Sequence, residues 1–157
     1  LEPFGGDLLW NLEIKTPATA PPALALVEKY RRSRRFLVTS FWHSLVEPFV
    51  RWPEVEGGLL LASRPATLEG INGLFPRDGR IWTAMWSYET LDPEVLERTA
   101  ALGMRNFTYG VATAAEHRAC AELPLTGVIS DRLDFALGLA GHAPGISPHS
   151  SSRPFAL

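Results

Sequence analysis

The chain has 157 residues, of which 46% are hydrophobic and 20% are charged, and these values are ordinary for one globular domain. Its formal net charge of -2, with no long basic stretch, removes the usual electrostatic argument for a nucleic-acid partner. No apolar run approaches the roughly 18 residues that a membrane-spanning helix needs. We therefore expect a small or lipid-derived molecule as the ligand, and no transmembrane segment.

Cys120 is the single cysteine, so the sequence offers no intramolecular disulfide and no thiolate metal site. We expect it to be a small buried apolar residue, and this cysteine usage favours the cytoplasm as the location. The chain begins at Leu1 rather than at Met and reaches its first apolar run almost at once. We therefore expect that the natural N-terminus lies upstream, where a targeting segment would be hidden.

The first predicted strand, at 8–15, carries the most informative pattern. Alternation along an extended strand places Asn11, Glu13 and Lys15 on one face and their apolar neighbours on the other. A carboxylate beside an ammonium at a strand end suits a site that holds a cation and a phosphate together. The alternative interpretation is a structural ion pair, which is the commoner role of such a pair.

Helical and extended patterns alternate along the rest of the chain. We expect strands at 36–41, 58–62, 80–86, 104–109 and 127–131, and helices at 20–32, 44–50, 93–102 and 114–123, with an irregular segment at 64–75. Asp92 fits an N-cap, Gly103 fits a left-handed helix terminus, and Thr113 with Glu116 has the spacing of a capping box. This alternation predicts right-handed βαβ units and a parallel sheet covered by helices, either open or closed into a barrel.

Several short motifs recur at strand ends in a recognisable order: Asn11 to Lys15, Thr39 to Phe41, Phe107 to Gly110, and Ile129 to Arg132. Together they resemble the glycerophosphodiester phosphodiesterase family, whose corresponding strands read N-I-E-I-K, S-F, W-T-V-N and I-T-D-R-P. The resemblance covers roughly 8–135. Gly110 replaces the asparagine of that pattern, and Leu133 replaces its proline.

The resemblance implies an α/β fold of the (βα)8 TIM-barrel type, present here as an incomplete barrel of strands three to eight. Residues 1–136 would form the C-terminal part of that barrel, followed by a Pro/Gly/Ser-rich tail at 137–157. The family's first two strands carry an H-R-G motif and an E-x-D metal pair, and neither is found in this sequence. Open barrel edges predict self-association.

The same resemblance implies roles for three residues. Glu13 would be a ligand of a divalent metal, Mg²⁺ or Ca²⁺, and Lys15 would be the catalytic group that binds the substrate phosphoryl oxygens. Phe107 would replace a tryptophan in the wall that contacts the glycerol or alcohol moiety. Such a site would perform metal-dependent hydrolysis of a glycerophosphodiester to glycerol 3-phosphate and an alcohol, with residues from the missing strands. The alternative is a non-catalytic module, derived from the barrel, that binds a phosphate-bearing ligand or a protein partner.

Other residues that could carry chemistry have simpler structural explanations. Ser40 lacks a histidine and acid partner set at recognisable spacing, so we expect an ordinary packed hydroxyl. A lone histidine such as His43 is more often a surface or capping residue. Trp82 and Trp86 lie four apart in a predicted strand, which favours packing in the core. The arginines at 31–35 would interact with a helix C-terminus, with attraction to phosphate headgroups as the weaker alternative.

Overall fold

The computed structural model describes residues 8–67, 69–70 and 81–139. The described strands are β1 (Leu9–Glu13), β2 (Arg35–Ser40), β3 (Val55–Leu61), β4 (Ile81–Ser87), β5 (Arg105–Tyr109) and β6 (Gly127–Val128). The described α-helices are α1 (Ala20–Tyr30), α3 (Pro93–Ala101), α4 (Ala114–Ala121) and α5 (Leu133–Leu139). Short 3-10 helices lie at η1 (Pro17–Thr19), η2 (His43–Leu45) and η3 (Tyr88–Thr90).

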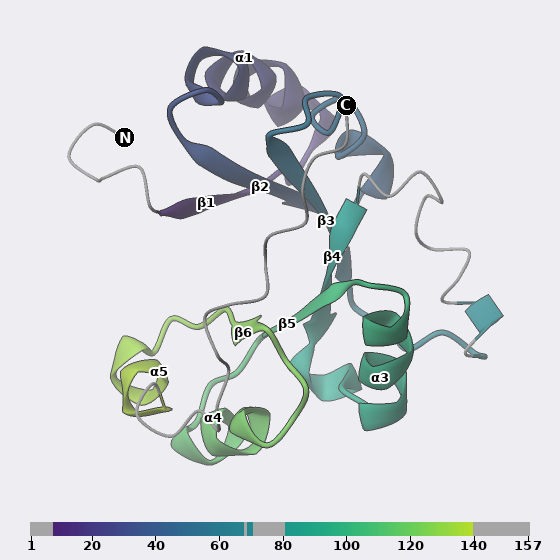
Figure 1. Ribbon diagram of the computed structural model, residues 1–157. Helices are drawn as coiled ribbons and strands as arrows, with labels where there is room; N and C mark the ends of the chain where they lie inside the picture. Colours follow the sequence, from purple (N-terminus) through teal and green to yellow (C-terminus); the bar gives the residue numbers. More distant parts are fainter. Residues whose placement is uncertain (1–7, 68, 71–80, 140–157) are drawn as a thin grey trace.

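The six strands form one parallel sheet in the order β1-β2-β3-β4-β5-β6. The sheet curls along its length into an incomplete barrel, with β1 and β6 as its outermost described strands (Figure 1). The expected parallel sheet and incomplete TIM-barrel fold are therefore confirmed. Since all strands run the same way, their carboxyl ends meet at one edge of the sheet, where barrel enzymes place their sites.

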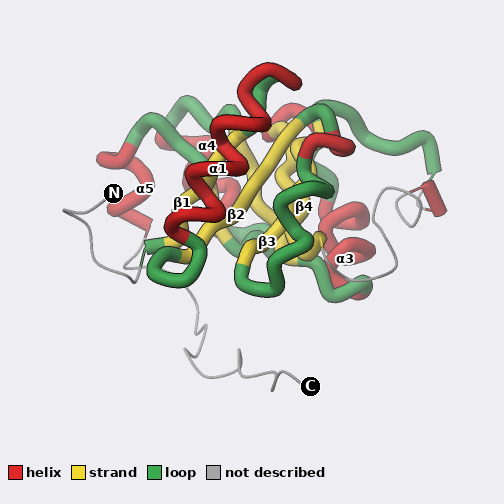
Figure 2. The backbone as a smooth tube through the Cα atoms, turned by 90° about the horizontal axis from the view of Figure 1, so that it is seen from above, coloured by secondary structure: helices red, strands yellow, loops and turns green. Residues whose placement is uncertain are grey.

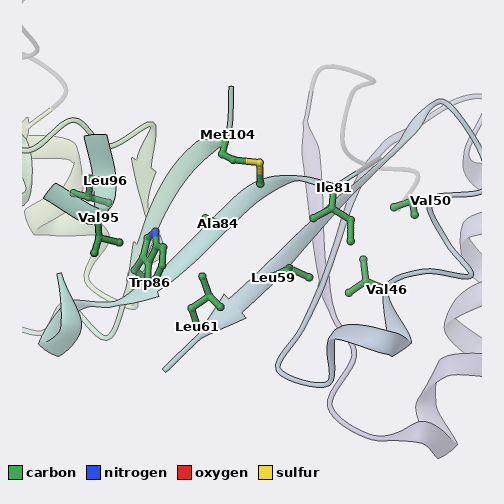
Figure 3. Packing of buried hydrophobic residues seen from close by; sticks show 10 residues of the cluster. All are labelled: Val46, Val50, Leu59, Leu61, Ile81, Ala84, Trp86, Val95, Leu96 and Met104. Atoms are coloured by element: carbon green, nitrogen blue, oxygen red, sulfur yellow. The ribbon is translucent and has the colours of Figure 1, made fainter. Parts of the chain in front are cut away.

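Helices surround the strands, which lie in the middle of the molecule when it is viewed from above (Figure 2). On the outer face one core cluster joins β3 and β4 to α3 and to the segment 46–50 (Figure 3). Its buried members are Val46, Val50, Leu59, Leu61, Ile81, Ala84, Trp86, Val95, Leu96 and Met104. A second outer cluster packs β1 and β2 against α1, with Val27 and Phe36 fully buried.

The inner face of the sheet changes character along the strands. At the amino ends, Glu56 forms ion pairs with Arg35 and Arg105, and Arg105 also donates to the Thr83 hydroxyl at 3.1 Å. Further along lies an apolar layer built on Leu37, Leu60 and Met85. The carboxyl ends carry Glu13 and Lys15. An ionic layer, an apolar layer and a second charged layer therefore succeed one another on this face.

The predicted helix termini of the second half are confirmed. Asp92 accepts a hydrogen bond from the backbone N–H of Glu94 at 2.8 Å, and Gly103 has φ +80°. Thr113 and Glu116 cap α4 reciprocally, as a capping box does. The backbone N–H groups of Ala112 and Thr113 each donate to the Glu116 carboxylate at 2.8 Å, and the backbone N–H of Glu116 donates to the Thr113 hydroxyl at 3.2 Å.

The helix expected at 44–50 is wrong. After η2 the chain continues through turns, in which the N–H of Phe49 bonds the carbonyl of Val46 and the N–H of Val55 bonds that of Trp52. Pro48 has no N–H to donate and disfavours helical geometry at the residue before it, which explains the loss of the helix. The apolar residues of this segment still enter the core, where Val46 and Phe49 are fully buried.

Two further expectations need adjustment. Trp86 is fully buried, but Trp82, which lies where the register between β3 and β4 shifts, keeps 42% of its surface exposed, so core packing holds for Trp86 alone. The last strand is shorter than predicted, since β6 contains only Gly127 and Val128. Helix α5 extends to Leu139, and the rest of the expected tail lies outside the described residues. No helix in the described part of the chain is long and apolar enough to cross a membrane.

Gly57 in β3 marks the place where the outer core is tightest. A Cβ atom added there would lie 2.5 Å from Cγ1 of Val50 and 3.1 Å from Cγ1 of both Ile81 and Val46. Gly57→Ala should therefore lower the free energy of unfolding by about 1–3 kcal/mol, the usual cost of overpacking a core. Denaturant unfolding of the two proteins measures the difference, and equal stability would mean that the segment 46–50 does not pack on β3 as described.

Candidate functional site

Glu13 and Lys15 project from the carboxyl end of β1 on the inner side of the sheet. The Lys15 ammonium lies 3.3 Å from Oε1 of Glu13, and the two side chains are 74% and 33% exposed respectively. The intervening Ile14 is buried in the outer core between β2 and α1. The predicted alternation is thus confirmed: the ion pair faces the inside of the curled sheet and remains accessible to a ligand.

The end of β1 is held rigidly against β2. The backbone N–H of Ile14 donates to the carbonyl of Thr39 at 2.8 Å, and the Ser40 hydroxyl donates to the carbonyl of Ile14 at 2.6 Å. Ser40 is completely buried and also accepts a hydrogen bond from the Trp42 N–H at 3.0 Å. Ser40 is therefore a structural clamp, as expected, and it fixes the strand end from which Glu13 and Lys15 project.

Tyr109, at the end of β5, is the neighbouring polar group on the inner face. Its hydroxyl donates to the Leu61 carbonyl at 3.3 Å, and its ring packs edge-to-face against Phe41 with the centroids 5.8 Å apart. Burial raises the pKa of Tyr109, a hydrogen bond with the Ser87 side chain lowers it, and the nearby Glu13 carboxylate raises it. Glu13 therefore lies near enough to Tyr109 to influence its pKa, although the two residues are on β1 and β5.

Phe107 lies one inward-facing position before Tyr109 and so deeper in the curled sheet. Its ring packs on the apolar layer of the inner face, and the Arg105 guanidinium sits 5.8 Å from the ring centroid. A Cβ atom on Gly127 would lie 2.9 Å from Cε1 of Phe107, so the absence of a side chain there makes room for the ring. Phe107 therefore forms the floor beneath the mouth of the barrel.

Sequence reasoning missed two aromatic residues at the carboxyl ends of the strands, Tyr109 and Phe41, whose rings contact each other. Tyr109 follows Phe107 by two residues, and Phe41 follows Thr39 by two, so strand alternation alone would have placed both on the inner face. Phe41 is 46% exposed. His43, in contrast, bonds the Leu60 carbonyl through Nε2 at 3.0 Å, which fits the structural role expected of it.

The described residues do not by themselves make a metal site. Within 8–67, 69–70 and 81–139, no group of three or more His, Cys, Asp or Glu side chains could hold a metal ion. Glu13 offers one carboxylate, which already pairs with Lys15, whereas Mg²⁺ and Ca²⁺ require six or more oxygen ligands. Glu13 could therefore contribute one ligand to a set completed by groups beyond the described residues.

The shared environment of Glu13 and Tyr109 can be tested directly. Glu13→Gln removes the negative charge that disfavours the phenolate, so the pKa of Tyr109 should fall. Ultraviolet titration of the phenol measures this pKa, and the same titration of Tyr109→Phe assigns the signal. Ser87→Ala is the opposite control, because loss of its hydrogen bond should raise the pKa of Tyr109. An unchanged pKa of Tyr109 in Glu13→Gln would mean that the Glu13 carboxylate does not lie close to the Tyr109 hydroxyl.

No protein-family model and no curated protein matches the sequence. Solved structures do match. A glycerophosphodiester phosphodiesterase from Thermotoga maritima superposes with a TM-score of 0.67 at 19% identity, covering 87% of this chain and 59% of its own. One from Parabacteroides distasonis gives 0.62 at 17%, covering 87% and 58%. An Oleispira antarctica phosphodiesterase, in complex with the product sn-glycerol-3-phosphate, gives 0.62 at 17%, covering 83% and 53%.

These likenesses establish the fold, since all three superpose over more than four fifths of the chain. The chain spans little more than half the length of each of these structures. It therefore has the fold of a large part of a phosphodiesterase TIM barrel, and its inner face at the carboxyl ends of the strands corresponds to the usual site of chemistry in such barrels.

Proposed function

We propose that this chain is the C-terminal part of a phosphodiesterase that hydrolyses glycerophosphodiesters to glycerol 3-phosphate and an alcohol. The observation that carries the proposal is the Glu13–Lys15 pair, exposed on the inner side of a curled parallel sheet at its carboxyl ends. Support comes from the structural likeness to glycerophosphodiester phosphodiesterases and from the motifs that the strands share with that family. The Oleispira antarctica protein holds sn-glycerol-3-phosphate.

Lys15 is the group that would bind the phosphoryl oxygens. Its side chain is 74% exposed, so a phosphodiester can reach the ammonium without displacing buried structure. A fixed cation near the phosphorus offsets the negative charge that builds on the oxygens when water or a hydroxyl group attacks. The Ser40 clamp supports this role, because it holds the end of β1 in a defined position.

The alcohol side of the substrate would lie against the aromatic residues. Phe107 provides an apolar floor, and the edge-to-face pair of Phe41 and Tyr109 stands beside it on the inner face. A glycerol moiety or a short apolar alcohol can pack on such rings, while polar groups at the rim fix its orientation. Phe107 in this scheme contacts substrate but takes no part in bond breaking.

Glu13 would serve as one ligand of a divalent cation, Mg²⁺ or Ca²⁺, whose other ligands come from outside the described residues. When bound, such a cation polarises the phosphoryl group. Of the two histidines among the described residues, His43 bonds the Leu60 carbonyl through Nε2, and His117 bonds the Thr113 carbonyl and the Ser130 hydroxyl. Proton donation to the leaving group would fall to an upstream histidine, as the family resemblance implies.

The second candidate function is a non-catalytic module that binds a phosphate-bearing ligand or a protein partner. The pairing of Lys15 with one carboxylate, that of Glu13, favours it, because a lysine among aromatic side chains suffices for binding a phosphate ester but not for cleaving one. Binding and hydrolysis therefore need separate measurements. In both cases we expect a cytoplasmic protein. This expectation rests on cysteine usage, and the buried, unpaired Cys120 is consistent with it.

Binding is tested with sn-glycerol 3-phosphate and the full chain by isothermal titration calorimetry. Lys15→Gln should weaken binding roughly tenfold, since a hydrogen bond to a charged group contributes about 1.5–3 kcal/mol. The matched control is Lys29→Gln, which removes an exposed lysine on α1, the only other lysine of the chain. Equal affinities in the two variants would reject Lys15 as the phosphate ligand.

Hydrolysis is tested by following release of glycerol 3-phosphate from a glycerophosphodiester while Mg²⁺ or Ca²⁺ is titrated. The measurement uses the full chain and, where the coding sequence continues upstream, the longer protein. Glu13→Gln should raise the metal concentration needed for half-maximal activity and lower turnover at least tenfold, because one charged ligand is lost. Product release with unaltered metal dependence in this variant would contradict the metal role. Binding without release in every form would favour the non-catalytic module.

A further inference from the structure

A strongly basic hollow lies at the opposite end of the strands from Lys15, where α1 turns into β2. It has a volume of about 270 Å³ and is lined by Arg31, Arg32, Ser33, Arg34, Arg35 and Glu54. Four arginines and one glutamate give this lining a formal charge of +3, whereas the whole chain carries -2. Positive charge is therefore concentrated at one place on a protein that is otherwise acidic.

Part of the lining is held in place by neighbouring groups. Arg31 forms an ion pair with Glu54, and its guanidinium also lies 5.1 Å from the centre of the Trp52 ring. Arg51 stacks on the same ring at 4.3 Å, which adds a further positive charge beside the hollow. The Arg31 and Arg51 guanidiniums are thus oriented before any ligand arrives, and preorganised charges bind with a smaller loss of conformational entropy.

Of the other arginines, Arg35 pairs with Glu56. Arg32 is exposed and, like Arg34, forms no ion pair with a described residue, and Arg34 donates to the carbonyl oxygen of Ser33 at 2.8 Å. Arg31 and Arg34 also each bury an Nε atom that has no hydrogen-bond partner among the described residues. Buried donors in folded proteins are normally paired, so this turn holds more hydrogen-bond donors than its own acceptors satisfy.

A favourable interaction with the C-terminus of α1 accounts for part of this arrangement. Lys29 lies in the last turn of the helix and Arg31 is its C-cap residue, where a cation interacts favourably with the helix end. The arginines follow the helix, and two of them are directed to carboxylates on the neighbouring β3 side, Arg31 to Glu54 and Arg35 to Glu56. The hollow is therefore an open space that is surrounded mainly by arginine guanidinium groups.

We propose that this hollow binds a phosphate group of at least two negative charges. Guanidinium groups match the oxygens of a phosphate in pairs of parallel hydrogen bonds, and the volume admits a phosphate or pyrophosphate with its water. The same chemistry is presented by a free phosphate compound and by the headgroup of phosphatidic acid at a membrane surface. The site is remote from Lys15, so it stands whether or not the proposed hydrolysis is correct.

The test titrates the full chain with pyrophosphate by calorimetry at low ionic strength, and separately with vesicles of phosphatidylcholine with and without phosphatidic acid. The double variant Arg32→Gln/Arg34→Gln removes the two guanidiniums of the lining that form no ion pair with a described residue, and binding should weaken by roughly a hundredfold. Arg118→Gln is the matched control, because Arg118 is also an exposed arginine at a helix C-terminus, on α4. Its affinity should equal that of the unaltered chain.

The possible outcomes distinguish a free phosphate ligand from a lipid headgroup, or reject the phosphate site. Pyrophosphate binding that the double variant loses supports the site and identifies a free ligand. Binding only to vesicles that contain phosphatidic acid, again lost in the double variant, supports the site and identifies a lipid headgroup. The absence of both at low salt overturns the proposal, as does binding that Arg118→Gln weakens equally. Because Lys15→Gln should leave pyrophosphate binding at the hollow unchanged, the two phosphate proposals can fail separately.

Discussion

The parallel register between neighbouring strands determines where every polar group of the inner face lies. Glu13 stands opposite Thr39, Leu60 opposite Met85, and Phe107 opposite Gly127. Side chains aligned in this way form layers across the sheet, and residues two apart along one strand belong to successive layers of the same face. A shift of one residue in β1 would turn Glu13 and Lys15 outward and drive Ile14 to the inside, since the side-chain period is two. Burial of Ile14 against α1 opposes that shift, and the Ser40 clamp fixes the strand end. The candidate site therefore depends on apolar packing that lies on the other face.

Curling of the sheet brings distant strands into one environment. Glu13 on β1 and Tyr109 on β5 are separated along the sheet by three strands, yet the carboxylate contributes to the raised pKa of the phenol. A flat sheet would keep strands β1 and β5 roughly 19 Å apart, at about 4.8 Å for each strand, where screening would suppress such an effect. The same curvature leaves β1 and β6 as outer strands of the described sheet. Self-association through these edges stays a prediction.

Sequence reasoning succeeded where a local interaction determines the structure. Asp92, Thr113 and Glu116 cap helices through hydrogen bonds within four residues, and Glu13 and Lys15 share a face because of backbone geometry alone. It failed at 44–50, where apolar spacing resembled a helix but Pro48 and the packing of Val46, Phe49 and Val50 on β2 and β3 produce turns. It also missed Tyr109, and it identified the arginines at 31–35 without the hollow that they line, because both depend on which strands and turns the folded chain brings together. The roles of Glu13, Lys15 and Phe107 come from family resemblance, and geometry alone does not assign them.

The weakness of the Glu13–Lys15 ion pair is itself an argument about function. An exposed pair of this kind contributes about 0–1 kcal/mol to stability, and the Lys15 side chain is 74% exposed. A phosphate that draws the ammonium away from Glu13 therefore loses little folding energy, and a second cation could then replace the ammonium beside the carboxylate. The buried contacts beneath the pair, from Ser40 to Ile14, do not depend on it. The residues that stabilise this strand end therefore differ from those proposed to bind a ligand, and the charged groups can exchange partners while the strand stays in place.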